Sequence, residues 1–244
     1  MKTVKILGVS IKNQTESQVL EQIIKYIQKP KEFIHVVSLN PENLVIASKD
    51  SKFKKVIETA QITIPDGIGV VLAARVKGLV LHGRVTGIDL FKNLLDLAGN
   101  MRLRVLLIGG RPDLALRCSQ CYQKKFPEAT FLGTIGFRDI KNPTTSEEDK
   151  IFDIVRHHKP HLIFVAFGSP YQELWLARHS KELKGIVCMG VGQGFDVIGG
   201  IVKRAPQWMQ NIGLEWLYRL LTQPWRWRRQ LGLIEFIKKL SNSD

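Results

Sequence analysis

The stretch LIFVAFGSP at residues 162–170 decides the fold class of this chain. Its six consecutive apolar residues predict a strand that is buried on both faces, and Gly168-Ser169-Pro170 ends that strand before a helical segment. The same order recurs at residues 104–108 and 186–189, each of which runs into a glycine turn. This alternation predicts an α/β fold, with a parallel sheet covered by helices on both faces.

The remaining segments extend the same pattern. Further strands are predicted at residues 4–9, 33–38, 62–64 and 130–134, with residues 4–9 as the first strand of the fold. Helix starts are predicted at the capping-box pair Thr15 and Gln18, at Asn40-Pro41, at Thr86 for a helix through Leu97, and at Ser146 with Asp149. Ligands of such folds bind beyond the carboxyl ends of the strands, so the turns there are the candidate sites.

Charge is the most unusual feature of the composition. The 244 residues include 36 Lys and Arg against 22 Asp and Glu, a formal net charge of +14. Such an excess favours a polyanionic partner: a nucleic acid, an anionic membrane surface or a phosphorylated substrate.

Three cysteines cannot form the disulfide framework of a secreted protein, no apolar run is long enough to span a membrane, and the N-terminus lacks signal-peptide features. We therefore expect a cytosolic protein.

The sequence changes character after about residue 200. Residues 201–244 carry no strand signal, hold four of the five tryptophans, and contain eight Lys or Arg against three acidic residues. We therefore expect a core domain at residues 1–200 and a basic appendage of two or three helices at residues 201–244, broken near Pro224. Leu233, Phe236, Ile237 and Leu240 form an apolar stripe that suits a helix on an anionic membrane surface, although a helix packed on the core needs the same stripe. The basic residues of this segment are also compatible with a solvated face or with a nucleic-acid patch.

Two polar turns follow predicted strands in the first half of the chain. The hydroxyl of Ser38 and the amide of Asn40 suit sugar hydroxyls or a phosphate, although Asn40 is equally suited to a plain helix cap. Asp66, held between Pro65 and Gly67, can point into a cleft as a general base. Asp66 is also compatible with a simple turn residue.

Glycine turns follow two strands of the second half. Gly168-Ser169 and Gly190-x-Gly192 can bring backbone N–H groups against a diphosphate, and Asp196 can hold ribose hydroxyls. Tight strand–helix packing would explain the same glycines. Neither turn matches the dinucleotide or P-loop fingerprint.

We expect no metal site, because the sequence has no dense carboxylate or histidine cluster and its one Cys-x-x-Cys pair, Cys118 and Cys121, falls inside a predicted helix.

Taken together and in order, these motifs resemble one family. They are Ser38-Leu39-Asn40-Pro41-Glu42, Ile64-Pro65-Asp66-Gly67-Ile68-Gly69, Gly83-Arg84-Val85-Thr86-Gly87-Ile88-Asp89, Leu107-Ile108-Gly109-Gly110, Gly168-Ser169-Pro170-Tyr171-Gln172-Glu173, Gly190-Val191-Gly192-Gln193-Gly194-Phe195-Asp196, Lys203-Arg204-Ala205-Pro206-x-Trp208 and Gly213-Leu214-Glu215-Trp216-Leu217-Tyr218-Arg219. Over about residues 5–232 the chain is similar to the WecG/TagA/CpsF glycosyltransferases, glycosyltransferase family 26.

The resemblance implies a Rossmann-like fold and an inverting transferase without a required metal or other cofactor. Such enzymes move an N-acetylmannosamine-type or related sugar from a UDP-sugar to an undecaprenyl-diphosphate-linked acceptor, in teichoic acid or exopolysaccharide synthesis. The expected partners are thus the UDP-sugar, the lipid-linked acceptor and an anionic membrane surface, with no nucleic acid. The expected location is the cytoplasm, at the inner face of the plasma membrane. Family members are associated with self-assembly, which leaves a homo-oligomer open.

The resemblance also assigns roles to single residues. Asp66 matches the proposed catalytic base, Asn40 and Gln172 match active-site polar positions, and Arg84 matches a cleft arginine. Appendage arginines thought to close over the diphosphate are matched by Arg219, Arg226 and Arg229. The chain departs from the family pattern at Ser38, where threonine is expected, at Tyr171, where lysine is frequent, and at Gln193, where a small residue is frequent; these departures concern the sugar and the acceptor. Two other functions stay open from the residues alone: a nucleotide-dependent dehydrogenase or epimerase, and a basic nucleic-acid-binding protein.

Overall fold

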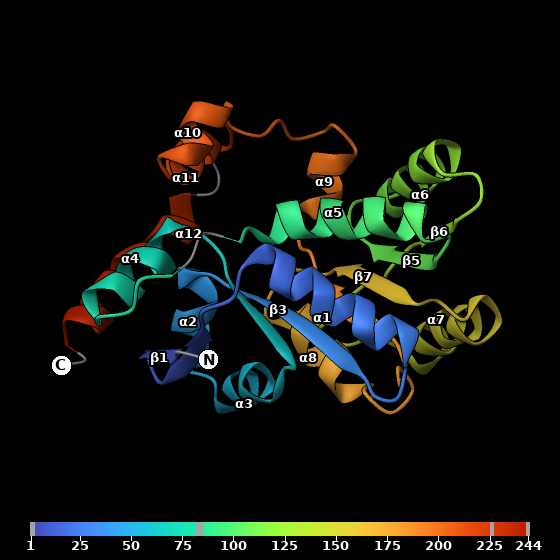
Figure 1. Ribbon diagram of the computed structural model, residues 1–244, viewed down its shortest axis with the longest axis horizontal. Coiled ribbons are helices and arrows are strands. Elements are labelled where there is room, and N and C mark those ends of the chain that lie inside the picture. Colours follow the sequence, from blue (N-terminus) through green and yellow to red (C-terminus); the bar gives the residue numbers. More distant parts are fainter. Residues whose placement is uncertain (1–2, 82–84, 225–226, 243–244) are drawn as a thin grey trace.

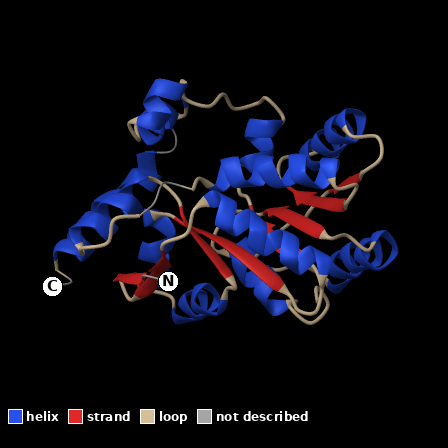
Figure 2. Cartoon of the chain, viewed as in Figure 1, coloured by secondary structure: helices blue, strands red, loops and turns tan. Residues whose placement is uncertain are grey.

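A six-stranded parallel sheet forms the centre of the molecule, in the order β4-β3-β8-β7-β5-β6 (Figures 1 and 2). The computed structural model describes residues 3–81, 85–224 and 227–242, with the backbone alone for residues 228–230. The strands are β3 (Ile34–Leu39), β4 (Ile62–Pro65), β5 (Arg104–Gly109), β6 (Thr130–Thr134), β7 (Leu162–Ala166) and β8 (Val187–Gly190). The predicted α/β fold with a parallel sheet is therefore confirmed, and β6 has the predicted bounds.

Helices cover both faces of this sheet. The preceding and intervening helices are α1 (Glu16–Gln28), α2 (Pro41–Ala47), α3 (Ser51–Thr59), α4 (Ile68–Val76), α5 (Gly87–Asn100), α6 (Leu114–Lys125), α7 (Thr145–His158), α8 (Tyr171–Arg178) and α9 (Gly194–Ile198). Alternate strand residues serve opposite faces, since Val36 joins the core under α1, α5 and α6, whereas Val37 joins the core with α2 and α3. Another core, around Ile163 and Trp175, lies under α7 and α8.

The N-terminal segment does not join the sheet, which corrects the expected first strand at residues 4–9. It forms a separate antiparallel hairpin of β1 (Thr3–Ile6) and β2 (Val9–Lys12). The chain reverses at Leu7 and Gly8, both of which have positive φ. Two consecutive residues with positive φ make the tight turn that antiparallel strands favour, so the apolar run is divided between two short strands.

One predicted helix start also differs. Helix α7 is capped by Thr144 in a capping box with Glu147, not by Ser146 with Asp149. Both pairs have the correct spacing in the sequence. The start at Thr144 lets Glu147 accept hydrogen bonds from the backbone N–H groups of Thr144 and Arg138, which anchors the preceding loop as well.

The C-terminal segment is helical, as expected. Within the described residues it forms α10 (Gln207–Asn211), α11 (Glu215–Thr222) and α12 (Trp227–Ser241). Helix α12 lies against α2, and Phe236 from its apolar stripe is buried with the residues of β1, β2, α2 and α3. Lys49 and Glu235 add an ion pair between these two regions, 2.7 Å apart. No helix in the described part of the chain is long and apolar enough to cross a membrane.

Candidate active site

A cavity of about 880 Å³ opens at the carboxyl ends of β3, β4, β7 and β8. Its walls come from the turns after those strands, the start of α5, and the helices α4, α11 and α12. Ten predicted site residues line it: Ser38, Asn40, Asp66, Gly168, Ser169, Gln172, Gly190, Gly192, Asp196 and Arg219. Arg84 and Arg226 lie outside the described residues, and the side chain of Arg229 is not described either.

Asp66 faces the first turn of α5 across the end of the sheet. Its backbone N–H donates to the carbonyl oxygen of Leu39, which fixes the turn after β4 beside β3. A Cβ placed on Gly87 would lie 2.6 Å from Ser38 Oγ and 3.3 Å from Asp66 Oδ2. Glycine at position 87 therefore leaves the space in which the hydroxyl and the carboxylate approach this helix. A helix N-terminus favours negative charge beside it, which suits the Asp66 carboxylate.

Asn40 serves as the cap of α2 and also lines the cavity. Its side-chain oxygen accepts a hydrogen bond of 2.8 Å from the backbone N–H of Asn43. Asn43, at the end of the same polar turn, is a cavity residue to which the sequence analysis assigned no role. It donates from Nδ2 to the carbonyl oxygen of Ser38 at 2.8 Å, and its own buried Oδ1 has no hydrogen-bond partner among the described residues.

Gln172 joins the two glycine turns. Its Oε1 accepts from the backbone N–H of Gly168 at 3.2 Å and from that of Gly192 at 3.1 Å. The two amides expected to face a diphosphate therefore bond Gln172 in this structure. Gly190 provides the room, because a Cβ at that position would lie 2.4 Å from Gln172 Nε2.

The buried carboxyl group of Glu173 accepts a hydrogen bond from Gln172. Glu173 is 2% exposed, and its Oε1 accepts from Gln172 Nε2 at 2.8 Å and from Ser169 Oγ at 2.9 Å. Burial raises the pKa of Glu173, although these two hydrogen bonds oppose the shift. The sequence analysis assigned Glu173 no role, although it ends the motif that contains Gly168, Ser169 and Gln172.

Asp196 pairs with a cation that the sequence motifs did not reveal either. Its carboxylate is nearly buried on α9, and Arg111 Nε lies 2.6 Å from its Oδ1. Both residues line the cavity. The carboxylate expected to hold ribose hydroxyls is thus already part of an ion pair with the turn that follows β5.

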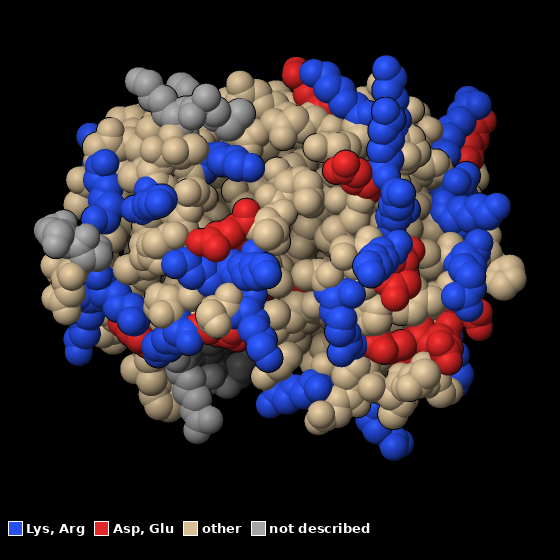
Figure 3. All heavy atoms as spheres, turned by 90° about the horizontal axis from the view of Figure 1, so that it is seen from below, with Lys and Arg blue, Asp and Glu red and all other residues tan. Residues whose placement is uncertain are grey.

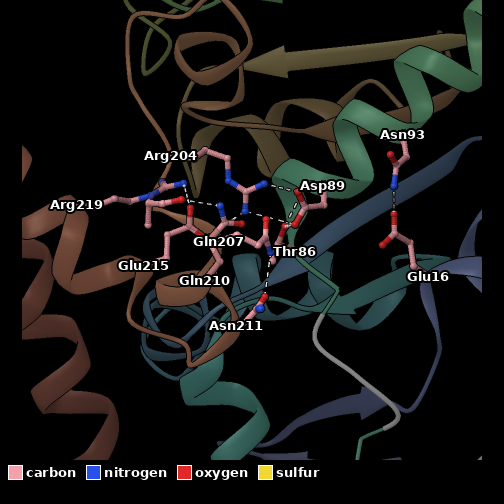
Figure 4. Close-up of polar contacts among 11 residues, drawn as sticks. Glu16, Thr86, Asp89, Asn93, Arg204, Gln207, Gln210, Asn211, Glu215 and Arg219 are labelled. Atoms are coloured by element: carbon pink, nitrogen blue, oxygen red, sulfur yellow. Dashed lines mark hydrogen bonds and ion pairs between the residues drawn. The ribbon is translucent and has the colours of Figure 1, made fainter.

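Four charged residues tie the C-terminal helices to the start of α5 (Figure 4). Arg204 donates from Nη1 to Asp89 and from Nη2 to Glu215 Oε2 at 3.2 Å, and Arg219 Nη2 donates to Glu215 Oε1 at 2.7 Å. Burial opposes ionisation of Glu215, but Arg219 and Arg204 outweigh burial and lower the pKa of this carboxyl. The two cations and two anions balance, and Arg219 is held at the cavity wall.

Comparison with known proteins decides the identity. The family model described as "Glycosyl transferase WecG/TagA/CpsF family" matches residues 4–243. This chain belongs to that family. It is a glycosyltransferase, so the resemblance noted from the motifs is confirmed, and neither a dehydrogenase nor a nucleic-acid-binding function is supported.

Relatives within the WecG/TagA/CpsF family carry a more specific name. An N-acetylglucosaminyldiphosphoundecaprenol N-acetyl-beta-D-mannosaminyltransferase of Bacillus subtilis is 30% identical over 97% of this chain and 90% of its own length. The protein of the same name from Bacillus spizizenii is 33% identical over 83% of this chain and 76% of its length. That from Staphylococcus aureus is 32% identical over 93% of this chain and 86% of its length.

The cavity of this family member combines the carboxyl groups of Asp66, Glu173, Asp196 and Glu215 with hydroxyl and amide groups and with the guanidinium groups of Arg111 and Arg219. A direct displacement needs only one of these carboxylates, which acts as the base that removes the proton of the attacking hydroxyl. Guanidinium groups suit phosphate oxygens, which they can bind in a bidentate manner. Among the described residues, no group of three or more His, Cys, Asp or Glu is arranged to hold a metal ion.

Proposed function

We propose that this glycosyltransferase moves an N-acetylmannosamine-type sugar from a UDP-sugar to an undecaprenyl-diphosphate-linked acceptor with inversion at the anomeric carbon. The observation that carries the proposal is the placement of Asp66 and Arg219 in the walls of one cavity. The names of the relatives support the lipid-linked acceptor and the sugar.

Asp66 acts as the base in this proposal. Its carboxylate takes the proton of the acceptor hydroxyl while the hydroxyl oxygen forms a bond to the anomeric carbon. The bond from that carbon to the β-phosphate oxygen breaks, and UDP leaves with the electron pair. Attack opposite the leaving group inverts the configuration.

Arg219 stabilises the negative charge that develops on the departing diphosphate. Preorganised cations lower the barrier most where charge develops in the transition state. Arg219 has to exchange part of its contact with Glu215 for the phosphate oxygens. By resemblance to the family, Arg226 and Arg229 add cations to the same task and Arg84 is a cleft arginine, so that the reaction proceeds without a metal or other cofactor.

The C-terminal helices place the enzyme at the membrane surface that holds its acceptor. Large apolar side chains are exposed on all three: Trp208 on α10 with Ile212 directly after it, Trp216 and Leu221 on α11, and Trp227, Leu231, Ile234 and Ile237 on α12. Aromatic and aliphatic residues among basic ones suit the interface of an anionic bilayer. Lys and Arg elsewhere are spread among Asp and Glu on the face shown in Figure 3. Attachment at the inner face of the plasma membrane follows from the location of the acceptor.

A two-stage experiment tests the function. In the first stage, a panel of UDP-sugars is screened for the rise in melting temperature of the full chain, and UDP-N-acetylmannosamine is expected to give the largest rise. In the second, that donor is incubated with a short-chain N-acetylglucosaminyl-diphosphate lipid, and NMR determines the anomer of the product. Absence of a thermal shift with every UDP-sugar, or a product of retained configuration, would contradict the proposal. Sedimentation with anionic and neutral vesicles tests the membrane attachment separately, with stronger binding expected to the anionic ones.

A further inference from the structure

The catalytic cavity has an apolar arm that the chemistry at Asp66 does not use. Beyond the polar turns, the same cavity is lined by two rows of apolar side chains. Ile68, Leu72 and Val76 provide the row on α4, and Leu233, Ile237 and Leu240 provide the row on α12. The spacing of four residues places the α4 side chains on one face of that helix. This wall is about 12 Å long, since each helical residue rises about 1.5 Å.

The two walls are held in place by the core. Val70, Ala73 and Ala74 on the other positions of α4 are buried, and Phe236 anchors α12 while also lining the cavity. At the entrance to the arm, a Cβ on Gly69 would lie 3.8 Å from Leu233 Cδ1. The arm is therefore formed without a ligand, which spares an apolar ligand the cost of ordering it.

The apolar walls are open to solvent. Leu72 is 53% exposed, Val76 77% and Ile237 58%. Among the residues of α4 and α12 whose side chains the structure describes, none of those that line the cavity is charged. Exposed apolar surface that continues directly into a catalytic cavity is what an apolar portion of the substrate would cover.

We propose that this arm, between α4 and α12, binds the first isoprene units of the acceptor's polyprenyl chain. The inference rests on the proposed function and names the part of the acceptor that the arm holds. When the acceptor hydroxyl is at Asp66, the acceptor's own diphosphate lies one sugar away from Asp66. The polyprenyl chain beyond that diphosphate has to leave the cavity through an apolar exit. The arm is the apolar part of the same cavity, so the head group and the start of the chain occupy one continuous site.

Chain length in the absence of a membrane provides the test. N-acetylglucosaminyl-diphosphate acceptors carrying one, two and three isoprene units are assayed below their micelle concentrations and without vesicles. We expect kcat/KM to rise roughly tenfold or more from the first to the third unit, because each buried methylene favours binding several-fold. Because no bilayer is present, this rise cannot come from docking of the C-terminal helices on lipid.

Matched variants test whether the dependence of kcat/KM on chain length arises in the arm. Leu72→Gln and Val76→Gln should bring the ratio of kcat/KM between the longest and shortest acceptors close to one. Val80→Gln is the control, since Val80 is 72% exposed just after α4 and does not line the cavity, and it should keep the wild-type ratio. Far-UV circular dichroism and melting temperature verify that each variant is folded.

The outcomes separate the two proposals. If none of the three acceptors, the longest included, receives a sugar from any UDP-sugar, the proposed function fails. If the acceptors are substrates but chain length has no effect in solution, or affects the rate only after vesicles are added, the arm does not bind the chain and the proposal for it is overturned. An equal change of the ratio in the Val80→Gln variant would overturn it too.

Discussion

Glu215 and Arg219 form an ion pair one helical turn apart on α11, with 2.7 Å between Oε1 and Nη2. The other oxygen of Glu215 bonds Arg204, whose guanidinium reaches Asp89 at the first turn of α5. One carboxylate thereby links an arginine in the wall of the cavity to the helix that begins beside Ser38 and Asp66. The C-terminal segment is thus fixed through charge, as well as through apolar packing, to the end of the sheet at which the cavity opens.

Replacing Glu215 by glutamine should destabilise the fold by about 2 kcal/mol, because two partly buried guanidinium groups lose their shared anion. Urea denaturation at neutral pH measures this change. The matched control is Glu128→Gln, which removes the exposed pair with Arg102 and should change the free energy of unfolding by less than about 0.5 kcal/mol.

The loss of stability in Glu215→Gln should depend on pH. The pKa of Glu215 is lowered in the fold, so the stability that its charge provides is complete above its ordinary value of 4.5 and is lost as the pH falls through the folded pKa. The difference between wild type and Glu215→Gln should therefore shrink in acid. A constant difference from neutral pH down to about pH 3 would contradict the role of this charge.

Asp66→Asn should lower kcat by about 100-fold or more, because the amide cannot accept the proton of the acceptor hydroxyl. Affinity for UDP should stay close to that of the wild type, since Asp66 does not bind the diphosphate in the proposed mechanism. Turnover and isothermal titration calorimetry measure the two quantities, with Asp149→Asn on the exposed side of α7 as control. Near-native turnover in Asp66→Asn would reject this residue as the base.

Gly87→Ala should reduce activity by about tenfold or more, because the added methyl group would lie 2.6 Å from Ser38 Oγ and press toward Asp66. Gly232→Ala in α12 is the matched control, since no atom that the structure describes lies within 4 Å of a Cβ there, and it should add about 0.5 to 1 kcal/mol of stability at unchanged activity. Steady-state kinetics and thermal melting compare the two. Equal activity of both variants would show that the close approach at Gly87 is not needed.

Glu173→Gln should become more stable relative to the wild type as the pH rises. Burial raises the pKa of Glu173, so the stability provided by its protonated form is complete below the ordinary value of 4.5 and is lost as the pH rises through the folded pKa. Glutamine cannot ionise and avoids this loss, while it can still accept from Ser169 and Gln172. Urea denaturation between about pH 4 and pH 8 should show the two curves diverging, whereas exposed Glu21→Gln should follow the wild type.

The sequence was sufficient where short-range patterns decide the structure. The apolar run at residues 162–167 and the turn after it predicted the strand β7 and the start of the cavity wall. Thr15 and Asn40 cap helices as expected from their spacing to Gln18 and Pro41. The hairpin at Leu7 and Gly8 was missed because an apolar run with one glycine does not show whether the chain continues or reverses.

The ordered motifs also identified the family and most of the residues along the cavity. They did not show that Gln172 occupies the amides of Gly168 and Gly192, or that Arg111 pairs with Asp196. A hydrogen-bonding group within a turn has several possible partners, and the sequence does not distinguish among them. Which partner they take depends on side chains that other strands and helices bring close.

By itself, the sequence determined the parallel α/β fold, the family and the turns that carry the polar groups, because apolar periodicity, capping residues and glycine act over a few positions. Only the tertiary structure decided that Arg204 meets Asp89, 115 positions away, and that α4 and α12 line one apolar arm of the cavity. Contacts between distant segments depend on how the helices pack on the sheet, and that packing is a property of the whole chain rather than of any local pattern.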